Sequence, residues 1–236
     1  MKKLLCTATA LALASTGTAA YAEDGQSYFG GFYLGAQVSG ARLTDKHSDH
    51  QYWYDGVHNA GYSKTKAQFG VRGGYDFTSG SLLAGVLGEV NFGKVSTFRE
   101  ISPSDPSYAI GTRIKMLGSV RARAGIASGR LALTANGGIA FNDNKQAYRE
   151  TDGTGEYYNG KGKRTGWVVG LGAAYAMAQH ISLGLDFSHY QFGSGRHIIL
   201  APNGTPRTGS DAADDHWHWS QKDSVNSLAL SVNYRF

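Results

Sequence analysis

The sequence lacks the residues that disulfide-bonded, zinc-binding or helical membrane proteins need. Cysteine occurs once, at Cys6, and proline four times in 236 residues. A single cysteine excludes an intrachain disulfide and a cysteine-based zinc site. After Ala22 no apolar run reaches the roughly 18 residues that a membrane-spanning helix needs. The pattern therefore predicts neither a disulfide scaffold nor a transmembrane helix.

The sequence also lacks a segment that concentrates charge of one sign. The formal net charge is +5, and the basic residues are interspersed with acidic ones. Without a concentrated basic patch, the sequence predicts no nucleic-acid site. Mild basicity is compatible with contact to anionic lipopolysaccharide. What is abundant is glycine, with 33 residues, and tyrosine, with 14, a composition that favours sheet with tight turns over helix.

The first 22 residues have the organisation of a secretory signal peptide. Lys2 and Lys3 form a charged start, Leu4–Ala14 form a short apolar segment, and Ala20-Tyr21-Ala22 is a small-residue cleavage site. We therefore expect residues 1–22 to be a signal peptide that is removed together with Cys6. Residues 23–236 are then long enough for one domain.

The last ten residues alternate between apolar and polar side chains. One parity is apolar and the other is polar, the period of a strand with two different faces. A strand in a membrane-spanning barrel combines a lipid-facing side with aromatic residues at its ends. We expect Tyr234 and Phe236 to form the C-terminal signal that the outer-membrane assembly machinery reads. The apolar parity consists of Leu228, Leu230, Val232, Tyr234 and Phe236.

Seven further segments show similar alternation, and each has the ten or so residues that a tilted strand needs to cross a bilayer. The sequence predicts an all-β fold, an eight-stranded antiparallel up-and-down transmembrane β-barrel. Together with the last strand, the eight segments are 31–43, 67–77, 82–95, 111–127, 130–142, 166–177, 180–192 and 227–236.

The connections between these segments alternate in length. Three are tight turns, near residues 78–80, 128–129 and 178–179, and four are long, near residues 44–66, 98–110, 149–164 and 198–222. Short periplasmic turns and long external loops are typical of outer-membrane barrels. We expect the protein in the outer membrane, with four extracellular loops and both termini periplasmic. The alternative, a soluble lipocalin-like barrel, would bury the apolar parity and expose the charged one.

Charged residues occupy the parity opposite to the apolar one. We expect them inside the barrel, where neighbouring strands bring Arg72, Glu89 and Arg121 or Arg123 together. Buried charges must be paired, and an eight-stranded barrel is just wide enough to be filled by side chains. The sequence favours a closed ionic plug, and a polar permeation path is the alternative. This interior network comprises Arg72, Asp76, Glu89, Arg121, Arg123, Asp186 and Arg235.

Histidines and aromatic residues gather in the first and last long loops. Histidine can ligate haem iron, and tryptophan can stack on a porphyrin, so these loops are a candidate haem site. The other interpretation is an aromatic surface that contacts lipid headgroups or a host surface. The residues are His47, His50, Trp53 and His58 in the first loop and His216, Trp217, His218 and Trp219 in the last.

Several strand motifs resemble those of small alphaproteobacterial outer-membrane β-barrel proteins of the porin family, which are similar to the OmpA/OmpX barrel. The resemblance covers nearly all strands and excludes the loops. It implies the barrel fold and a surface-antigen or porin role, and some relatives are described as haem-binding. The segments that carry it are Gly31–Gly35, Leu87–Asn91, Gly118–Gly125, Gly137–Ala140, Gly166–Gly170 and Asn233–Phe236.

The sequence favours a structural role in the envelope combined with loops that interact at the cell surface. Adhesion, haem capture, small-solute transport and lipid A modification are the alternatives. For the last, Asp186, Ser188 and His189 lie close in sequence, but His189 has the opposite strand parity, so one strand cannot assemble a triad. We therefore assign no catalytic residue and no metal ligand. Haem is the one candidate cofactor.

Overall fold

The part of the chain that the structure describes consists of β-strands and short connections. The computed structural model describes residues 28–49, 61–102, 105–150, 155–161, 164–193, 195–198 and 218–236. No helix in this part of the chain is long and apolar enough to cross a membrane. The strands are β1 (Gly31–Asp49), β2 (Gly61–Ser79), β3 (Leu82–Ser102), β4 (Asp105–Ser128), β5 (Leu131–Asn142), β6 (Lys145–Glu150), β7 (Gly155–Lys161), β8 (Arg164–Ala176), β9 (Ile181–Phe192), β10 (Gly195–Ile198) and β11 (His218–Arg235).

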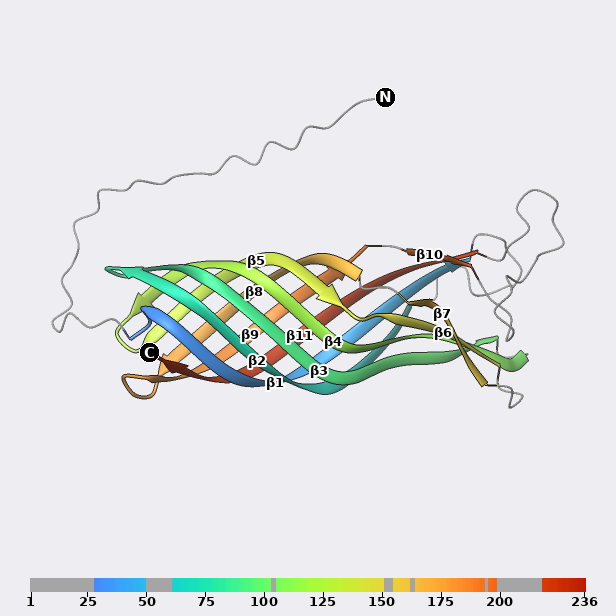
Figure 1. The fold of residues 1–236 in the computed structure, drawn as a ribbon, viewed down its shortest axis with the longest axis horizontal. Coiled ribbons are helices and arrows are strands. Elements are labelled where there is room, and N and C mark those ends of the chain that lie inside the picture. The colour runs from blue at the N-terminus through green and yellow to red at the C-terminus, as the bar shows by residue number, and fades with distance from the viewer. Residues whose placement is uncertain are drawn as a thin grey trace, which may run out of the picture.

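Eight long strands close into a cylinder (Figure 1). The hydrogen-bonded order is β3-β2-β1-β11-β9-β8-β5-β4, and β3 also pairs with β4, which closes the sheet. All these pairings are antiparallel. The short strands β6, β7 and β10 extend the wall at one end. The predicted eight-stranded antiparallel up-and-down barrel is confirmed.

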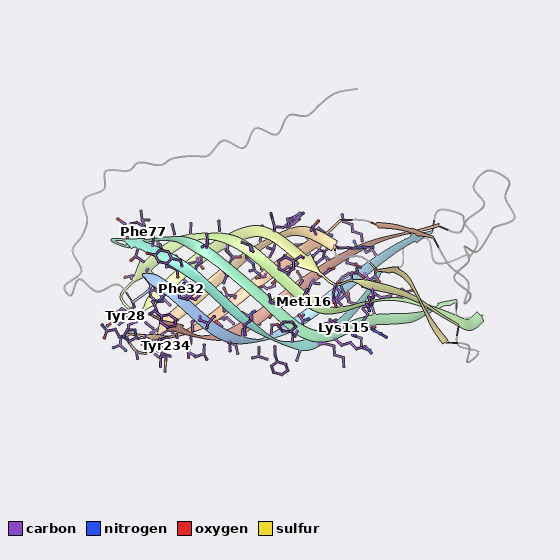
Figure 2. The ribbon with its side chains drawn as sticks, viewed as in Figure 1. Tyr28, Phe32, Phe77, Lys115, Met116 and Tyr234 are labelled. Carbon is purple, nitrogen blue, oxygen red and sulfur yellow. The ribbon has the colours of Figure 1, made fainter. Side chains whose placement is uncertain are left out.

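The outer wall of the barrel is apolar. Each of the eight long strands exposes large hydrophobic side chains on the predicted parity, for example Phe69 at 67% and Leu171 at 65%. So many exposed apolar residues would be unfavourable in water, at about 25 cal/mol per Å², and a contiguous patch of this size marks a surface that is covered. Figure 2 shows these side chains around the wall. The lipocalin-like alternative is wrong, because it requires this parity inside.

The two ends of the barrel differ. The turn end carries the tight connections between β2 and β3, β4 and β5, and β8 and β9, together with the start of β1 and the end of β11 (Figure 1). Gly80 and Gly129 adopt φ values of +57° and +54° in two of these turns, a left-handed conformation that favours glycine. The backbone N–H of Phe236 donates to the Phe32 carbonyl at 3.0 Å, so the C-terminus is fixed beside β1.

At the opposite end, the loop end, the strands continue well beyond the predicted boundaries. Only residues 103–104 separate β3 from β4. Strand β7 lies within the predicted loop 149–164 and pairs with β6, which begins before that loop. The predicted loop at 98–110 is therefore wrong, because a hairpin occupies it. Apolar alternation ends where the apolar belt ends, but the backbone ladder continues with polar side chains.

One strand departs from the predicted alternation. On β4, Ile114 is buried although it shares the parity of the exposed Val120, and Lys115 is exposed although it shares that of the buried Arg121. The cause is an irregularity at which β4 has one residue more than its partners β5 and β6. The Asp143 carboxylate stabilises it by accepting the backbone N–H groups of Lys115 and Met116, both at 2.8 Å. An extra residue reverses the parity of everything beyond it.

Candidate functional site

The middle of the barrel interior is organised around the guanidinium of Arg121 on β4, which is 1% exposed. Its Nε donates to Ser119 Oγ at 2.8 Å, and its Nη1 donates to Asn136 Oδ1 at 3.1 Å and Ser188 Oγ at 2.7 Å. Its Nη2 forms an ion pair with the Glu89 carboxylate. These partners come from β3, β4, β5 and β9, so one side chain connects four strands.

Tyr190 on β9 completes this group. Its hydroxyl accepts from Arg121 and donates to the Glu89 carboxylate. The Arg121 guanidinium also lies 5.2 Å from the Tyr190 ring centroid. An ion pair removed from water is tolerated only when further hydrogen bonds satisfy both partners, and this arrangement meets that requirement.

A second group connects the walls through Arg72 on β2. Arg72 forms an ion pair with Asp186 of β9, across the lumen, and donates to Ser231 Oγ of β11 at 3.2 Å. The Arg72 partner in the strand register is Glu89, but the guanidinium binds Asp186 instead. Glycine on β8 makes room for this pair, because a Cβ at Gly172 would lie 2.5 Å from Asp186 Oδ1.

The groups of Arg72 and Arg121 are linked by Gln37 on β1. The Gln37 amide donates to Asn91 Oδ1 at 2.7 Å and to Glu89 Oε2 at 3.4 Å, and its oxygen faces Arg72 Nη1 at 3.5 Å. The polar core therefore forms one connected network through the middle of the barrel.

A third ionic group lies toward the turn end. Asp76 is 0% exposed and lies between two arginines, with Oδ1 3.4 Å from Arg123 Nε and Oδ2 3.1 Å from Arg235 Nη2. Both guanidiniums also lie over the Tyr33 ring, 5.7 Å and 5.0 Å from its centroid. An apolar layer of Phe29, Leu83, Ala132 and Ala176 packs together at this end.

The loop end holds an apolar layer and a further ionic group that the sequence analysis missed. Residues that include Leu43, Ile114 and Phe192 form the layer. The ionic group contains two carboxylates. Asp45 Oδ2 accepts from Thr112 Oγ1 at 2.8 Å, and Asp223 Oδ2 accepts from Arg164 Nη1 at 3.3 Å. Both carboxylates are 0% exposed. Both residues have the strand parity that faces the lumen, but Asp45 lies in the predicted loop 44–66.

Asp45 and Asp223 are paired in the register of β1 and β11, beyond the apolar belt on the loop side. Burial and the nearby Asp45 carboxylate raise the pKa of Asp223 well above its usual range. Asp223 therefore holds a proton in the folded protein at pH values where a free aspartate is ionised.

Among the described residues, interior arginines and carboxyl groups are equal in number. Five of each face the lumen. A cavity lined by Arg72, Arg123, Asp186 and Arg235 has a volume of about 20 Å³, roughly the space of one water molecule. The arginines are Arg72, Arg121, Arg123, Arg164 and Arg235, and the carboxylates are Asp45, Asp76, Glu89, Asp186 and Asp223.

The structure places the candidate loop residues only in part. His47 lies on β1, and His218 and Trp219 begin β11; in the register His47 faces Gln221, and Trp219 faces both Asp49 and His197. His197 was not singled out from the sequence. In the described part of the chain, no three histidine, cysteine or acidic side chains cluster as metal ligands. His50, Trp53, His58, His216 and Trp217 lie outside the described residues.

The candidate residues for lipid A chemistry are separated by the barrel wall. Asp186 and Ser188 are buried in the interior network, whereas His189 is on the other parity. The His189 ring lies 5.5 Å from the Trp167 ring, and its Nδ1 is 2.7 Å from Asn226 Oδ1. The structure therefore does not bring Ser188 and His189 together.

Comparisons with known proteins agree with this architecture. A family model described as outer membrane protein beta-barrel domain matches residues 7–236, and the chain belongs to this family. It is similar to the 31 kDa outer-membrane immunogenic protein of Brucella melitensis and of Brucella suis, with 28% identity over 212 residues, 78% of this chain and 82% of each relative.

A solved structure shows the same fold at low sequence identity. The outer membrane protein OprG from Pseudomonas aeruginosa is 12% identical, with a TM-score of 0.56 over 90% of this chain and 99% of that chain. Family and fold together place the protein in the outer membrane, with its apolar belt in the lipid.

Proposed function

We propose that the protein is a closed, non-conducting surface barrel that stabilises the outer membrane and presents its loop end to the outside. One observation carries the proposal: the lumen is filled by interlocking ion pairs and by apolar layers near both ends. A solute would have to separate several buried ion pairs to pass, and each separation would leave an uncompensated charge in a poorly solvated interior.

The orientation follows from the ends of the barrel. The tight turns, the start of β1 and the end of β11 lie at one end, and β6, β7 and β10 extend the wall at the other. Outer-membrane barrels place short turns in the periplasm and long loops outside. The immunogenicity stated in the name of the Brucella relatives supports a loop end that is accessible at the cell surface.

Removal of the signal peptide, residues 1–22, and recognition of the last strand by the assembly machinery are part of this proposal. The Phe236 ring lies 5.7 Å from the Phe32 ring and 5.1 Å from the Tyr234 ring, so the C-terminal aromatics complete one aromatic cluster on the outer wall.

Planar-bilayer recording of the refolded protein tests the closed lumen. The expected result is no stable conductance step above that of the empty bilayer. Large, stable steps in the wild-type protein would replace the plug with a permeation path. Labelling of single cysteines on intact cells tests the orientation, and we expect labelling at residue 55 and none at residue 80.

Haem capture is a second candidate, favoured by the backbone register at the loop end. Strands β1, β10 and β11 bring the positions of His47, His197 and Trp219 onto neighbouring strands. A haemin titration should give a Soret shift that disappears in a His216→Ala/His218→Ala variant. A wild-type protein that produces no shift would end this hypothesis. An enzymatic role has no comparable support, because Ser188 and His189 lie on opposite parities.

A further inference from the structure

The middle and the turn side of the lumen hold more positive than negative side chains. Among the residues that the structure describes, four arginines and three carboxylates lie there. Glu89 forms its ion pair with Arg121, so three arginines share the two remaining carboxylates. The arginines are Arg72, Arg121, Arg123 and Arg235, and the carboxylates are Asp76, Glu89 and Asp186.

The two carboxylates at the loop end do not compensate this excess, because the apolar layer lies between. Along β1, Leu43 of that layer precedes Asp45, and along β11, Val225 of the same layer follows Asp223. Asp223 also has an arginine of its own, Arg164. One positive charge therefore remains in excess on the turn side of the layer, and a buried charge without a counter-charge is costly.

A cavity lies among the three arginines that share two carboxylates. Its volume is about 20 Å³, and roughly 10–15 Å³ suffices for one particle of the size of water. The space therefore fits a monatomic ion and is too small for sulfate or phosphate. Its charged lining consists of Arg72, Arg123, Arg235 and Asp186, and its polar lining includes Thr134, Ser182, Ser231 and Asn233.

The arginines at this cavity have N–H donors to spare. The Nε groups of Arg72 and Arg235 are buried and donate no hydrogen bond to any described residue, and both side chains are more than nine-tenths buried. Asp186, the carboxylate in the lining, is already engaged by Arg72. A buried donor without an acceptor costs free energy, so an acceptor in the cavity would stabilise the folded barrel.

The amide of Asn233 adds a neutral donor. A Cβ at Gly35 would lie 2.4 Å from Asn233 Oδ1, whereas one at Gly184 would lie 3.6 Å from Asn233 Nδ2. The amide nitrogen is therefore on the side of Gly184, which lines the cavity. Glycine also keeps this space open, because a Cβ at Gly184 would lie 2.4 Å from Ser231 Oγ.

We propose that this cavity binds one chloride ion, which neutralises the excess charge of the three arginines. Arg72 and Arg235 provide positive charge and N–H donors, and Asn233 provides an amide donor. A water molecule would occupy the same volume but would leave the charge uncompensated. The site goes beyond the proposed function, because it depends neither on the orientation of the barrel nor on its loops.

Urea unfolding of the refolded protein in micelles tests the site. Gluconate replaces chloride at constant ionic strength, so that general screening stays the same. An ion that binds only the folded state should raise the folding equilibrium constant about 10-fold for each tenfold rise in chloride above the dissociation constant. An unfolding midpoint that does not change with chloride would overturn the proposal.

An Asn233→Asp variant sharpens this test, because it places a carboxylate beside the arginines without changing the size of the side chain. The variant should lose the chloride dependence. The matched control is Asn226→Asp, the same substitution on the outer parity of β11, which should keep the dependence of the wild type. Equal dependence in both variants would assign the salt effect to the surface or to the unfolded chain, and would contradict the site.

Anomalous diffraction from wild-type crystals grown in bromide locates the ion without any variant. We expect one peak among Arg72, Arg235 and Asn233. Density without an anomalous signal at this position would show that water occupies the cavity, and would overturn the proposal. Planar-bilayer recording remains the separate test of the closed lumen, so failure of the chloride site and failure of the proposed function are distinguishable.

Discussion

The barrel interior and the outer wall place positive charge in different surroundings. Inside, five arginines lie among five carboxyl groups, and Glu89 touches both Arg121 and Tyr190. Outside, Lys94 on the same strand as Glu89 is exposed, beside Lys115. The lumen is filled by side chains, so charge there must be neutralised largely by protein groups. Lys94 and Lys115 are exposed, so solvent can screen their charges.

The largest effect should come from removing one charge of the interior network. Glu89→Ala leaves the Arg121 guanidinium buried without its counter-ion, and breaking a buried pair in this way costs about 3–5 kcal/mol. Urea unfolding in micelles, followed by tryptophan fluorescence, measures the free energy of unfolding. A midpoint equal to that of the wild type would mean that the interior charges do not hold the barrel closed.

Removing both partners of an interior pair should be milder than removing one. Asp186→Leu alone leaves Arg72 unpaired, whereas Arg72→Met/Asp186→Leu replaces the ion pair with apolar groups. A double-mutant cycle should give a coupling free energy of about 1–3 kcal/mol. Additive losses would contradict the view that Arg72 and Asp186 act as a pair across the lumen.

A moderate, pH-dependent effect is expected at the loop end. Because the pKa of Asp223 is raised in the folded state, its contribution to stability is complete below the unfolded pKa of about 4 and is lost as pH rises through the folded pKa. Asp45→Asn removes the neighbouring negative charge. The variant should gain about 1 kcal/mol over the wild type at pH 8 and gain nothing at pH 4.

Unfolding at both pH values measures this difference. Thr112, which donates to Asp45, offers a control: Thr112→Val removes a hydrogen bond and leaves both carboxylates in place. Its effect should be the same at both pH values. An Asp45→Asn profile parallel to that of the wild type would show that the two carboxylates do not interact.

The smallest effect should come from the outer wall. Lys94→Gln or Lys115→Gln should change the free energy of unfolding in micelles by less than about 0.5 kcal/mol, as for most exposed substitutions. A loss comparable to that of Glu89→Ala would erase the distinction between the two regions. Heat-modifiable migration in gel electrophoresis checks that both variants fold.

Much of the barrel was predictable from local pattern. Alternation identified eight strands and the lipid-facing parity, and the seven predicted interior residues lie in the lumen. The interior contacts were less accessible. Arg72 and Glu89 are neighbours in the register, as expected, but Arg72 pairs with Asp186 on the other side of the cylinder. Asp45 and Asp223 escaped notice because their surroundings lack apolar alternation.

The sequence by itself determined which side chains face lipid and which face the lumen, because a strand has a period of two and each residue carries that information locally. Only the tertiary structure decided which buried charges meet, where the ladder continues past the belt, and that Lys115 faces outward. Those features depend on contacts across a closed cylinder and on the residue that Asp143 fixes in β4, and strand alternation contains neither.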